Sequence, residues 1–357
     1  MKKLISAILA LMLIISLIPV ASAAEYNGFV YKKNSVGNYV IMGYTDYSTK
    51  AVKIPEKIKG IKVTAVGRGA FQQMNNITSV TIPSTVSVIS SMSFYGCRNL
   101  TSVTLSDAVT SIGSKAFGMC TKLKGINLKK VKTVGEHAFF GCKSLKTLKC
   151  GTALKVIGAY AFENCSALST LTQSSVLIYI GNYAFSGCSS ITSLTLPNSL
   201  TYIGNSAFKN CTALKTLKLG SGAMDIDSYA FENCTSLTSL TIPKTVKSIG
   251  RHAFALREAN STKFTHKVKL TCSRYAPGMS YAKMHNVTVY VNELNKTITC
   301  FGDINGNKKA DTNDGLRLLR IAASMDNAIS GEKLFLCDIN CNGKIDVGDA
   351  NYVLLNA

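Results

Sequence analysis

The chain has 357 residues, enough for two or three domains, and it carries 40 Lys and Arg against 19 Asp and Glu, a net charge of +21. Residues 300–357 hold six basic and eight acidic residues, whereas residues 24–299 hold 32 and 11. A body this basic favours anionic neighbours such as cell-wall polymers or acidic polysaccharide, although a basic surface without a specific partner explains the charge equally well.

The N-terminus has the pattern of a secretory signal. Met1–Lys3 is charged, Leu4–Val20 is apolar, and Ala21–Ala23 forms a small-residue cleavage site. We therefore expect residues 1–23 to be removed on export, which argues against nucleic acid as a partner. The alternative is an N-terminal anchor helix, but no second apolar run follows, so we expect a secreted, extracellular chain that does not span a membrane.

A 23-residue repeat dominates the next part of the chain. Cysteines recur at steps of 22 or 23 residues, each with a phenylalanine three positions earlier, and the phenylalanine phase extends one unit further at each end. The nine phenylalanines are Phe71, Phe94, Phe117, Phe139, Phe162, Phe185, Phe208, Phe231 and Phe254.

Each repeat divides into three pieces. Segments such as Leu237–Ile242 alternate as a short half-buried strand, Ile-Gly pairs such as Ile203–Gly204 indicate a second strand and a bend, and Ala-Phe-x-x-Cys-x-x-Leu places one apolar stripe on a short helical turn. One such unit cannot bury its apolar side alone, but a stack of about nine units can.

The recurring Ile-Gly-x-x-Ala-Phe-x-x-Cys pattern resembles the bacterial BspA-like leucine-rich repeats, over about residues 60–260. The resemblance implies an α+β chain that begins as a β-rich solenoid. We place an N-terminal cap at 24–65, the repeats at 66–265, a C-terminal cap at 266–291 with a helix over Tyr281–His285, and a linker at 292–298.

The cysteines fit the repeat better than they fit disulfide or metal chemistry. A strict phase stacks seven of them in one interior column, where Cys acts as a small apolar filler, and Cys150 occupies an apolar strand position. Outside the column, a Cys272–Cys300 or a Cys337–Cys341 bridge remains open, because spacing alone decides neither.

Two twelve-residue loops near the C-terminus share one pattern, Asp303–Asp314 and Asp338–Asp349. Each places oxygen-bearing side chains at loop positions 1, 3, 5, 9 and 12, and an apolar stretch follows. Hard cations such as calcium take six to eight oxygen ligands from loops of this spacing.

The pair resembles a type I dockerin, which we place at 299–357, because position 12 is Asp in both loops and the helix before each loop is missing. The resemblance implies a small all-α module of paired EF-hand-like motifs that binds two Ca²⁺ ions and attaches to a cohesin of a cellulosome scaffoldin. The implied ligands of the first ion are Asp303, Asn305, Asn307, Lys309 (carbonyl), Asp311 and Asp314, and those of the second are Asp338, Asn340, Asn342, Lys344 (carbonyl), Asp346 and Asp349.

The two loops differ at position 6, which is Gly343 in the second and Lys308 in the first. Glycine accepts the sharp turn there without penalty, so we expect the first loop to bind calcium more weakly. The implied cohesin contacts also differ in chemistry between the halves, which predicts one preferred face. They are Thr312, Asn313, Leu319, Arg320 and Ser324 in the first half, and Val347, Gly348, Leu354 and Leu355 in the second.

Catalytic patterns are missing from the sequence. It shows no nucleophile elbow, zinc-protease helix or phosphate loop. Glu163 and Glu232 share a repeat phase but stand three units, ~15 Å, apart, too far to act as a pair. We interpret Asp225, Asp227 and Glu232 as a solvated cluster or neighbours of a lysine.

His137 and His252 occupy one repeat position, which we expect to be exposed. The sequence therefore predicts a non-catalytic binding or adhesion protein. There are two alternatives. One is an enzyme with an unrecognised site, since dockerins are usually attached to glycoside hydrolases. The other is a host-surface adhesin.

A binding face is predicted on the first strand of each repeat. Two outward columns should run along the stack, rich in threonine and carrying two lysine patches. They read Thr81, Thr104, Asn127, Lys149, Thr172, Thr195, Lys218 and Thr241, and Thr78, Thr101, Lys124, Lys146, Ser169, Thr192, Lys215 and Thr238. Solenoids use such faces for macromolecular partners, although threonine is also a good sheet former.

Overall fold

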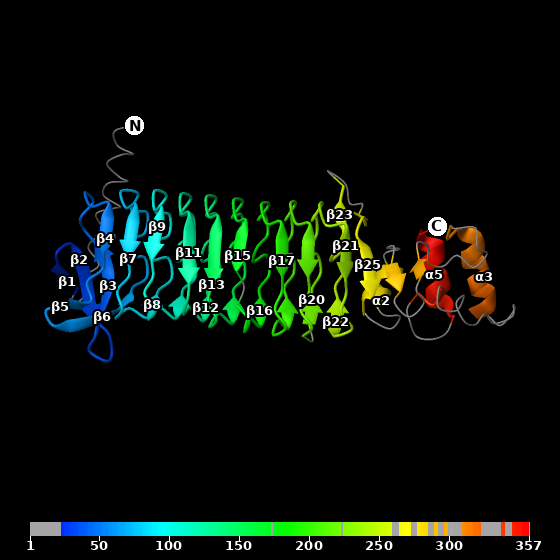
Figure 1. The fold of residues 1–357 in the computed structure, drawn as a ribbon, viewed down its shortest axis with the longest axis horizontal. Coiled ribbons are helices and arrows are strands. Elements are labelled where there is room, and N and C mark those ends of the chain that lie inside the picture. The colour runs from blue at the N-terminus through cyan, green and yellow to red at the C-terminus, as the bar shows by residue number, and fades with distance from the viewer. Residues whose placement is uncertain are drawn as a thin grey trace, which may run out of the picture.

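The computed structural model is an elongated stack of coils with helices at its C-terminal end (Figure 1). It describes residues 23–172, 174–222, 224–258, 264–272, 277–284, 289–291, 296–298, 301, 309–322, 337–339 and 345–356. All but the last residue of the predicted signal peptide lies outside these ranges.

A 13-stranded sheet, here called the long sheet, runs the length of the stack. Its first three strands are antiparallel neighbours, β5 pairs antiparallel with β6 at the side, and the other strands from β3 onward each pair in parallel with the next coil. The strands are β1 (Ala24–Tyr26), β2 (Phe29–Lys33), β3 (Tyr39–Tyr44), β5 (Lys57–Ile58), β6 (Ile61–Val66), β8 (Val88–Ile89), β10 (Ser111–Ile112), β12 (Thr133–Val134), β14 (Val156–Ile157), β16 (Tyr179–Ile180), β18 (Tyr202–Ile203), β20 (Met224–Ile226) and β22 (Val246–Ile249).

A second row of strands, here called the strand row, lies along the other edge of the stack in Figure 1. Its ladders are parallel but broken after β9, β15 and β19 into separate sheets. The strands are β4 (Ala51–Lys53), β7 (Ser79–Thr81), β9 (Ser102–Thr104), β11 (Gly125–Leu128), β13 (Thr147–Cys150), β15 (Thr170–Thr172), β17 (Ser193–Thr195), β19 (Thr216–Lys218), β21 (Ser239–Thr241) and β25 (Lys269–Cys272).

The Phe-Cys piece of each repeat is a series of tight turns and not the helical turn that we predicted. In one coil Ala116 N donates to Gly113 O, Cys120 N to Phe117 O and Leu123 N to Cys120 O, each over three residues. Lys115, just before Ala116, has a φ of 57°, and Met119, inside the piece, has a φ of 61°. A helix cannot continue through left-handed φ, so the apolar stripe is carried by consecutive turns.

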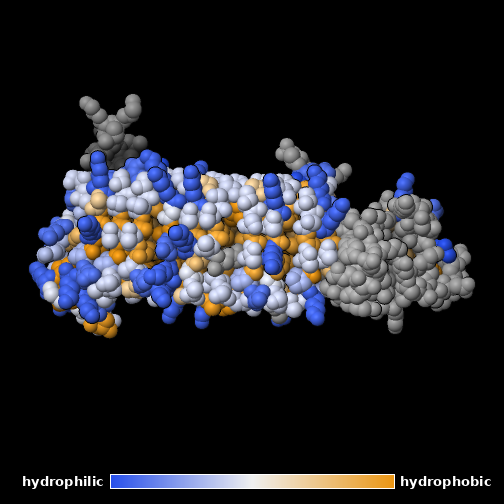
Figure 2. All heavy atoms as spheres, viewed as in Figure 1, coloured by the Kyte–Doolittle hydropathy of each residue, from blue (hydrophilic) through white to orange (hydrophobic). Residues whose placement is uncertain are grey.

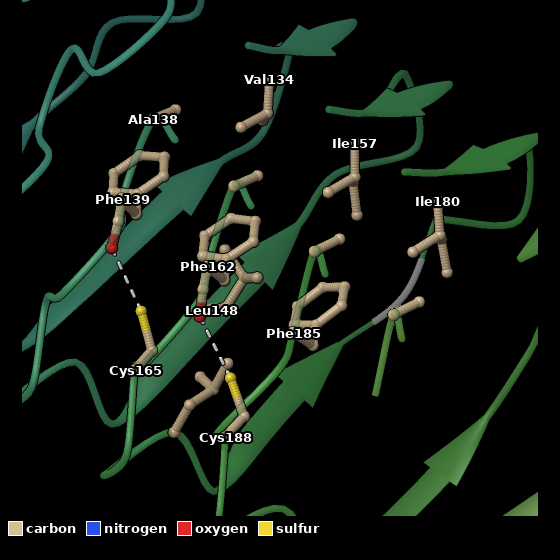
Figure 3. Packing of buried hydrophobic residues seen from close by; sticks show 14 of the residues in the cluster. Val134, Ala138, Phe139, Leu148, Ile157, Phe162, Cys165, Ile180, Phe185 and Cys188 are labelled. Atoms are coloured by element: carbon tan, nitrogen blue, oxygen red, sulfur yellow. Dashed lines mark hydrogen bonds between the residues drawn. The ribbon is translucent and has the colours of Figure 1, made fainter. Parts of the chain in front are cut away.

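Stacked phenyl rings form the core of the solenoid (Figure 3). Phe162 lies between Phe139 and Phe185 with ring centroids 5.1 and 5.2 Å away and interplanar angles of 2° and 9°. The Cys188 thiol donates to the Phe162 carbonyl of the preceding coil at 3.2 Å. The coil repeat of ~4.8 Å, set by strand pairing, brings identical side chains to stacking distance, and this explains the strict phase.

The glycine that follows the second strand of each coil is required by the same close spacing. A Cβ added at Gly181 would lie 2.6 Å from Ala159 N of the coil before it. Only glycine allows the backbones to approach so closely at this bend, which accounts for the recurring Ile-Gly pair.

The stack closes with a hairpin and a short helix. Helix α2 (Pro277–Met284) begins earlier than the predicted helix, whose last residue, His285, lies outside the described residues. Strands β26 (Val289–Val291) and β27 (Lys296–Ile298) extend the last sheet, so part of the predicted linker is paired. β23 (Leu256–Arg257) and β24 (Phe264–Thr265) form a separate hairpin.

Two further helices follow, α3 (Thr312–Ala322) and α5 (Val347–Asn356). They pack together around a small core of Leu318, Cys337, Ala350 and Val353. Gly315 at the start of α3 lies against Leu354 at the end of α5, so the two helices run antiparallel.

Candidate functional site

The strand row presents the predicted outward columns. All eight residues of the first column, from Thr81 to Thr241, are exposed, and the parallel ladders place Asn127 beside Lys149 and Lys149 beside Thr172. In the second column the last six residues are exposed and the first two half-buried. The predicted surface of hydroxyls and two lysine patches is therefore confirmed as a continuous feature of the fold.

Two shallow grooves cross this surface where the strand row is broken. One, of about 550 Å³, lies between β15 and β17 and is lined by serine and threonine together with Leu171 and Pro197. The other, of about 470 Å³, lies between β19 and β21 and is lined by Lys215, Lys218 and neighbouring residues. These grooves could not be predicted from the sequence, because every coil has the same pattern on both sides of each break.

We expected the repeat position just before Ala-Phe, occupied by His137 and His252, to be exposed. In the structure both side chains are instead packed against neighbouring rings. His137 stacks on Tyr160 with centroids 4.6 Å apart, and His252 stacks on Phe264 at 3.9 Å. His252 is only 8% exposed. Burial, the largest cause, lowers the pKa of both histidines. These contacts favour structural roles for both rings.

The acidic cluster near the C-terminal end of the stack is likewise structural. Glu232 is 1% exposed, so the predicted solvation is wrong for it, while the predicted lysine neighbour is confirmed: Lys209 Nζ lies 2.7 Å from its Oε2. Asp225 accepts from Ser248 Oγ at 2.6 Å, and Asp227 accepts from Tyr202 OH at 2.8 Å.

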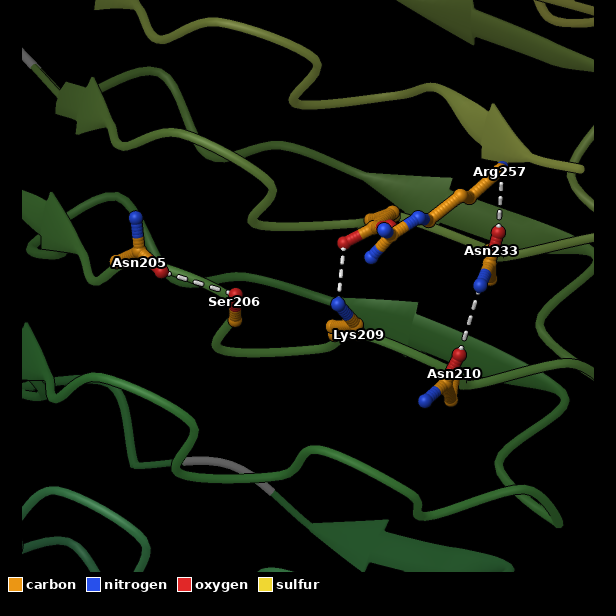
Figure 4. A network of polar contacts seen from close by, with 7 residues as sticks. Asn205, Ser206, Lys209, Asn210, Asn233 and Arg257 are labelled. Atoms are coloured by element: carbon orange, nitrogen blue, oxygen red, sulfur yellow. Dashed lines mark hydrogen bonds and ion pairs between the residues drawn. The ribbon is translucent and has the colours of Figure 1, made fainter. Parts of the chain in front are cut away.

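A ladder of amides continues beside this ion pair (Figure 4). Asn233 Nδ2 donates to Asn210 Oδ1 at 3.0 Å, and Asn233 Oδ1 accepts from Arg257 N at 2.7 Å. Both asparagines have a positive φ, 60° and 59°, which this residue type tolerates better than most. The side chains here serve to join adjacent coils.

The two C-terminal loops end in the same hydrogen-bond pattern. Asp311 Oδ1 accepts from Asn313 N at 2.9 Å, and Asp311 N donates to Asp314 Oδ2 at 3.0 Å. In the second loop Asp346 Oδ1 accepts from Gly348 N at 2.7 Å, and Asp346 N donates to Asp349 Oδ2 at 2.9 Å. This is a capping box, which by itself stabilises the start of a helix.

One further contact goes beyond capping. Asp349 Oδ1 accepts from Ile339 N at 2.7 Å, and so ties loop position 12 to loop position 2. Asp314 and Asp349 are both 0% exposed and Asp338 is 7% exposed. Three buried carboxylates in loops whose ligand types are all oxygen fit a hard divalent cation such as calcium.

The implied calcium ligands fall partly inside and partly outside the described residues. Asp303, Asn305, Asn307, Lys308, Asn340, Asn342 and Lys344 lie outside the described residues, whereas Lys309, Asp311, Asp314, Asp338, Asp346 and Asp349 lie inside. Within the described ranges, no group of three or more His, Cys, Asp or Glu side chains converges on one point.

The predicted partner residues divide between the two ends of the helix pair. Thr312, Asn313, Val347 and Gly348 are exposed at the helix starts, which lie at opposite ends because the helices are antiparallel. Leu319 and Leu354 are half-buried: Leu319 packs against the small core, and Leu354 lies against Gly315 of the other helix. Arg320 and Leu355 are described only in their backbone, and Ser324 lies outside the described residues.

The helix pair is joined to the solenoid through a buried lysine. Lys283, at the end of α2 and 2% exposed, donates from Nζ to the carbonyl of Asp338 at 2.6 Å. Phe301 and Ile339 belong to the main core, and Tyr352 packs against both cores. We did not predict this contact, since Lys283 has the sequence context of an ordinary surface residue.

The cysteines of the repeats form a column of buried thiols. All seven repeat cysteines are buried, free thiols, as predicted, and burial raises their pKa values. Cys272 and Cys337 are buried too. Cys300 and Cys341, the partners in the bridges that we left open, lie outside the described residues.

None of the helices in the described part of the chain has the length and hydropathy that a membrane crossing needs.

Comparison with known proteins agrees with the coil geometry. No curated protein matches the chain. Among solved structures, a leucine rich cell surface protein from Faecalibacterium prausnitzii is 27% identical over 65% of this chain and 73% of its own, with a TM-score of 0.56. A leucine-rich repeat protein from Eubacterium ventriosum is 30% identical over 53% of this chain and 49% of its own, with a TM-score of 0.47.

The family comparison covers most of the chain. The profile of the BspA type leucine rich repeat region matches residues 35–169 and 155–276, the same part of the chain that forms the stacked coils. By its sequence and by its fold, this chain belongs to the BspA-type leucine-rich-repeat family.

Proposed function

We propose that this protein is a surface-associated binding protein without catalytic activity, whose solenoid recognises a macromolecular partner along the strand row. The observation that carries the proposal is the uninterrupted exposure of the first outward column from Thr81 to Thr241. A relative described as a cell surface protein has the same fold, which supports an extracellular location for this chain as well.

For the C-terminal helix pair, we propose calcium-dependent attachment to a cohesin-type partner on a cellulosome scaffold. The support is the matched pattern of the two loops and the contact between Asp349 and Ile339, which closes the second loop. Calcium would be held by the side chains of both twelve-residue loops, where it would supply positive charge among the buried carboxylates.

The protein's own residues prepare this site. Asp311 and Asp346 cap the two helices, and Asp314 and Asp349 are held by backbone N–H donors. The exposed helix starts then offer a polar pair, Thr312–Asn313, at one end and an apolar-small pair, Val347–Gly348, at the other. A partner that fits one pair does not fit the other, so we expect a single preferred face.

A pull-down tests this attachment. The full chain from residue 24 is immobilised, and secreted proteins of its source organism are passed over it with calcium and then with chelator. A cohesin-bearing protein recovered only with calcium supports attachment. Recovery that is unchanged by chelator, or no recovery at all, reduces the loops to a structural clip.

Matched variants make the test specific to the loops. We expect Asp314→Ala with Asp349→Ala to abolish calcium-dependent recovery, whereas Asp107→Ala, an exposed carboxylate on the solenoid, should leave it unchanged. Exchanging Thr312–Asn313 for Val-Gly should abolish binding if this is the preferred face. The reverse exchange at Val347–Gly348 is its control.

A further inference from the structure

Nine lysines gather on two adjacent coils in the middle of the solenoid, and we call them the lysine band. All nine are exposed, and Glu136 is the one acidic residue between the first and the last of them. They are Lys122, Lys124, Lys129, Lys130, Lys132, Lys143, Lys146, Lys149 and Lys155. Figure 2 shows hydrophilic side chains at both edges and near the middle of this face, over the part of the stack where Figure 1 labels β11, β12 and β13.

The band places like charges in register. Lys146 N donates to Lys124 O at 2.8 Å beside the strand row, and Lys155 N donates to Lys132 O at 2.9 Å beside the long sheet. Each pair therefore occupies the same position in adjacent coils, ~4.8 Å apart along the stack. Like charges in register on adjacent strands destabilise a sheet.

The fold does not require lysine at these positions. Beside Lys124 and Lys146 in the same column, the neighbouring coils carry Thr101 and Ser169. Few of the band's charges are neutralised within the chain: among the described residues, Lys129 is the one member of the band in an ion pair, with Asp107 at 2.6 Å. A repulsive cluster that packing does not explain, and that remains uncompensated, points to a ligand that supplies negative charge.

The chemistry of the band narrows the class of ligand. It contains no arginine, and therefore lacks the forked guanidinium that binds phosphate bidentately. Beside the strand row its outward neighbours are Asn127 and Thr172, which offer no ring on which a base could stack. Beside the long sheet one exposed ring, Tyr179, pairs with Val156 next to Lys155, so single-stranded DNA is included as a competing probe in the test. Hydroxyl groups on the flanking coils can both donate to and accept from sugar hydroxyls.

We propose that the lysine band binds a linear polysaccharide that carries carboxylate groups, laid across the coils from the strand row to the long sheet. The inference rests on the proposed binding role of the solenoid, and it specifies the chemical class of molecule that the solenoid binds. Lys124 and Lys146 contact the polymer beside the strand row, and Lys132 and Lys155 contact it beside the long sheet.

The test uses the full chain from residue 24 and polygalacturonate as the probe, with the fully methyl-esterified polymer as the neutral control. Binding is measured by biolayer interferometry from about 50 to about 300 mM NaCl, where screening of exposed charges grows. We expect binding to the charged polymer only, with an affinity that falls steeply as salt rises.

Variants locate the site. Lys124→Gln with Lys146→Gln, and separately Lys132→Gln with Lys155→Gln, should each weaken binding by about tenfold, since each removes two contacting charges. Lys57→Gln with Lys62→Gln removes the same charge from the paired strands β5 and β6, outside the strand row and three coils before β12, and should change the affinity less than about twofold.

Three results would overturn the proposal. Equal loss in the control pair would mean that only net charge matters. Equal binding of the esterified polymer would show that carboxylates are not recognised. Tighter binding of single-stranded DNA would assign the band to nucleic acid. Calcium-dependent capture of a cohesin is measured in a separate experiment. Failure of the polysaccharide proposal can therefore be distinguished from failure of the proposed attachment through the helix pair.

Discussion

Replacing Lys209 with methionine tests whether the buried ion pair holds the C-terminal end of the solenoid together. Lys209 Nζ lies 2.7 Å from Glu232 Oε2, and the side chains are 26% and 1% exposed. The carboxylate accepts no well-aligned hydrogen bond from the described residues. Without the lysine, a buried charge would have no compensation.

Removing one partner of a buried ion pair costs about 3–5 kcal/mol. Because water reaches the lysine but hardly reaches the carboxylate, we expect Lys209→Met to lower the free energy of unfolding by about 3 kcal/mol, the lower end of that range. The double variant with Glu232→Met replaces the pair by two apolar side chains of similar size. It should return to within about 1 kcal/mol of the parent.

Urea unfolding followed by circular dichroism measures the effect, with Lys215→Met as the control because that lysine is exposed and makes no ion pair with a described residue. A loss below about 1 kcal/mol in Lys209→Met would refute the reasoning. So would a double variant as unstable as the single one, since the cost would then not come from the stranded charge.

Three further predictions follow from the solenoid. Lys146→Gln should stabilise the fold by about 0.2–1 kcal/mol in low salt, because it removes a like charge in register with Lys124. The midpoint of urea unfolding should then rise, and an unchanged or lower midpoint would contradict this. Burial raises the pKa of Cys142 and of Cys211 to about 12, so iodoacetamide at neutral pH should label neither until urea is added, as mass spectrometry can show. Burial lowers the pKa of His266 from 6.5 to about 4, so between these pH values the unfolded chain binds more protons than the folded chain. The free energy of unfolding should therefore fall as pH decreases through that window. In His266→Gln the fall should be smaller.

The coil contents were predictable from sequence because each coil repeats its neighbours. Phe162 and Cys165 are fully buried, and Lys149 and Thr195 are exposed, each as the 23-residue phase requires. Stacking places equivalent residues in equivalent environments, so one correct assignment serves every coil.

The backbone between these positions was harder to predict. His137 and Tyr160 have φ values of 54° and 56°, in the left-handed region that residues other than glycine seldom adopt. The stack of rings and the hydrogen bonds between coils hold them there, and neither is visible in one repeat. This is why the Phe-Cys piece is a series of turns although its apolar spacing indicated a helix.

Burial of Glu232 and Lys283 could not be predicted for a related reason. A charged residue in a repeat is normally solvated, and its burial depends on what packs against it. Glu232 lies next to Lys209 of the coil before it, and Lys283 donates to a carbonyl 55 residues further along the chain. Such contacts lie between segments that the sequence pattern treats as separate.

The Lys283 contact also bears on how the two proposed binding surfaces work together. It fixes the C-terminal helix pair against the closing end of the stack, and Phe301 and Ile339 in the main core strengthen that attachment. The lysine band lies about five coils, ~25 Å, before the last phenylalanine, Phe254. Since the intervening coils keep these surfaces apart, a scaffold bound at the helices would not cover a polymer laid across the band. The same rigid spacing would hold that polymer at a set distance from the scaffold, which a flexible linker between the two parts would not do.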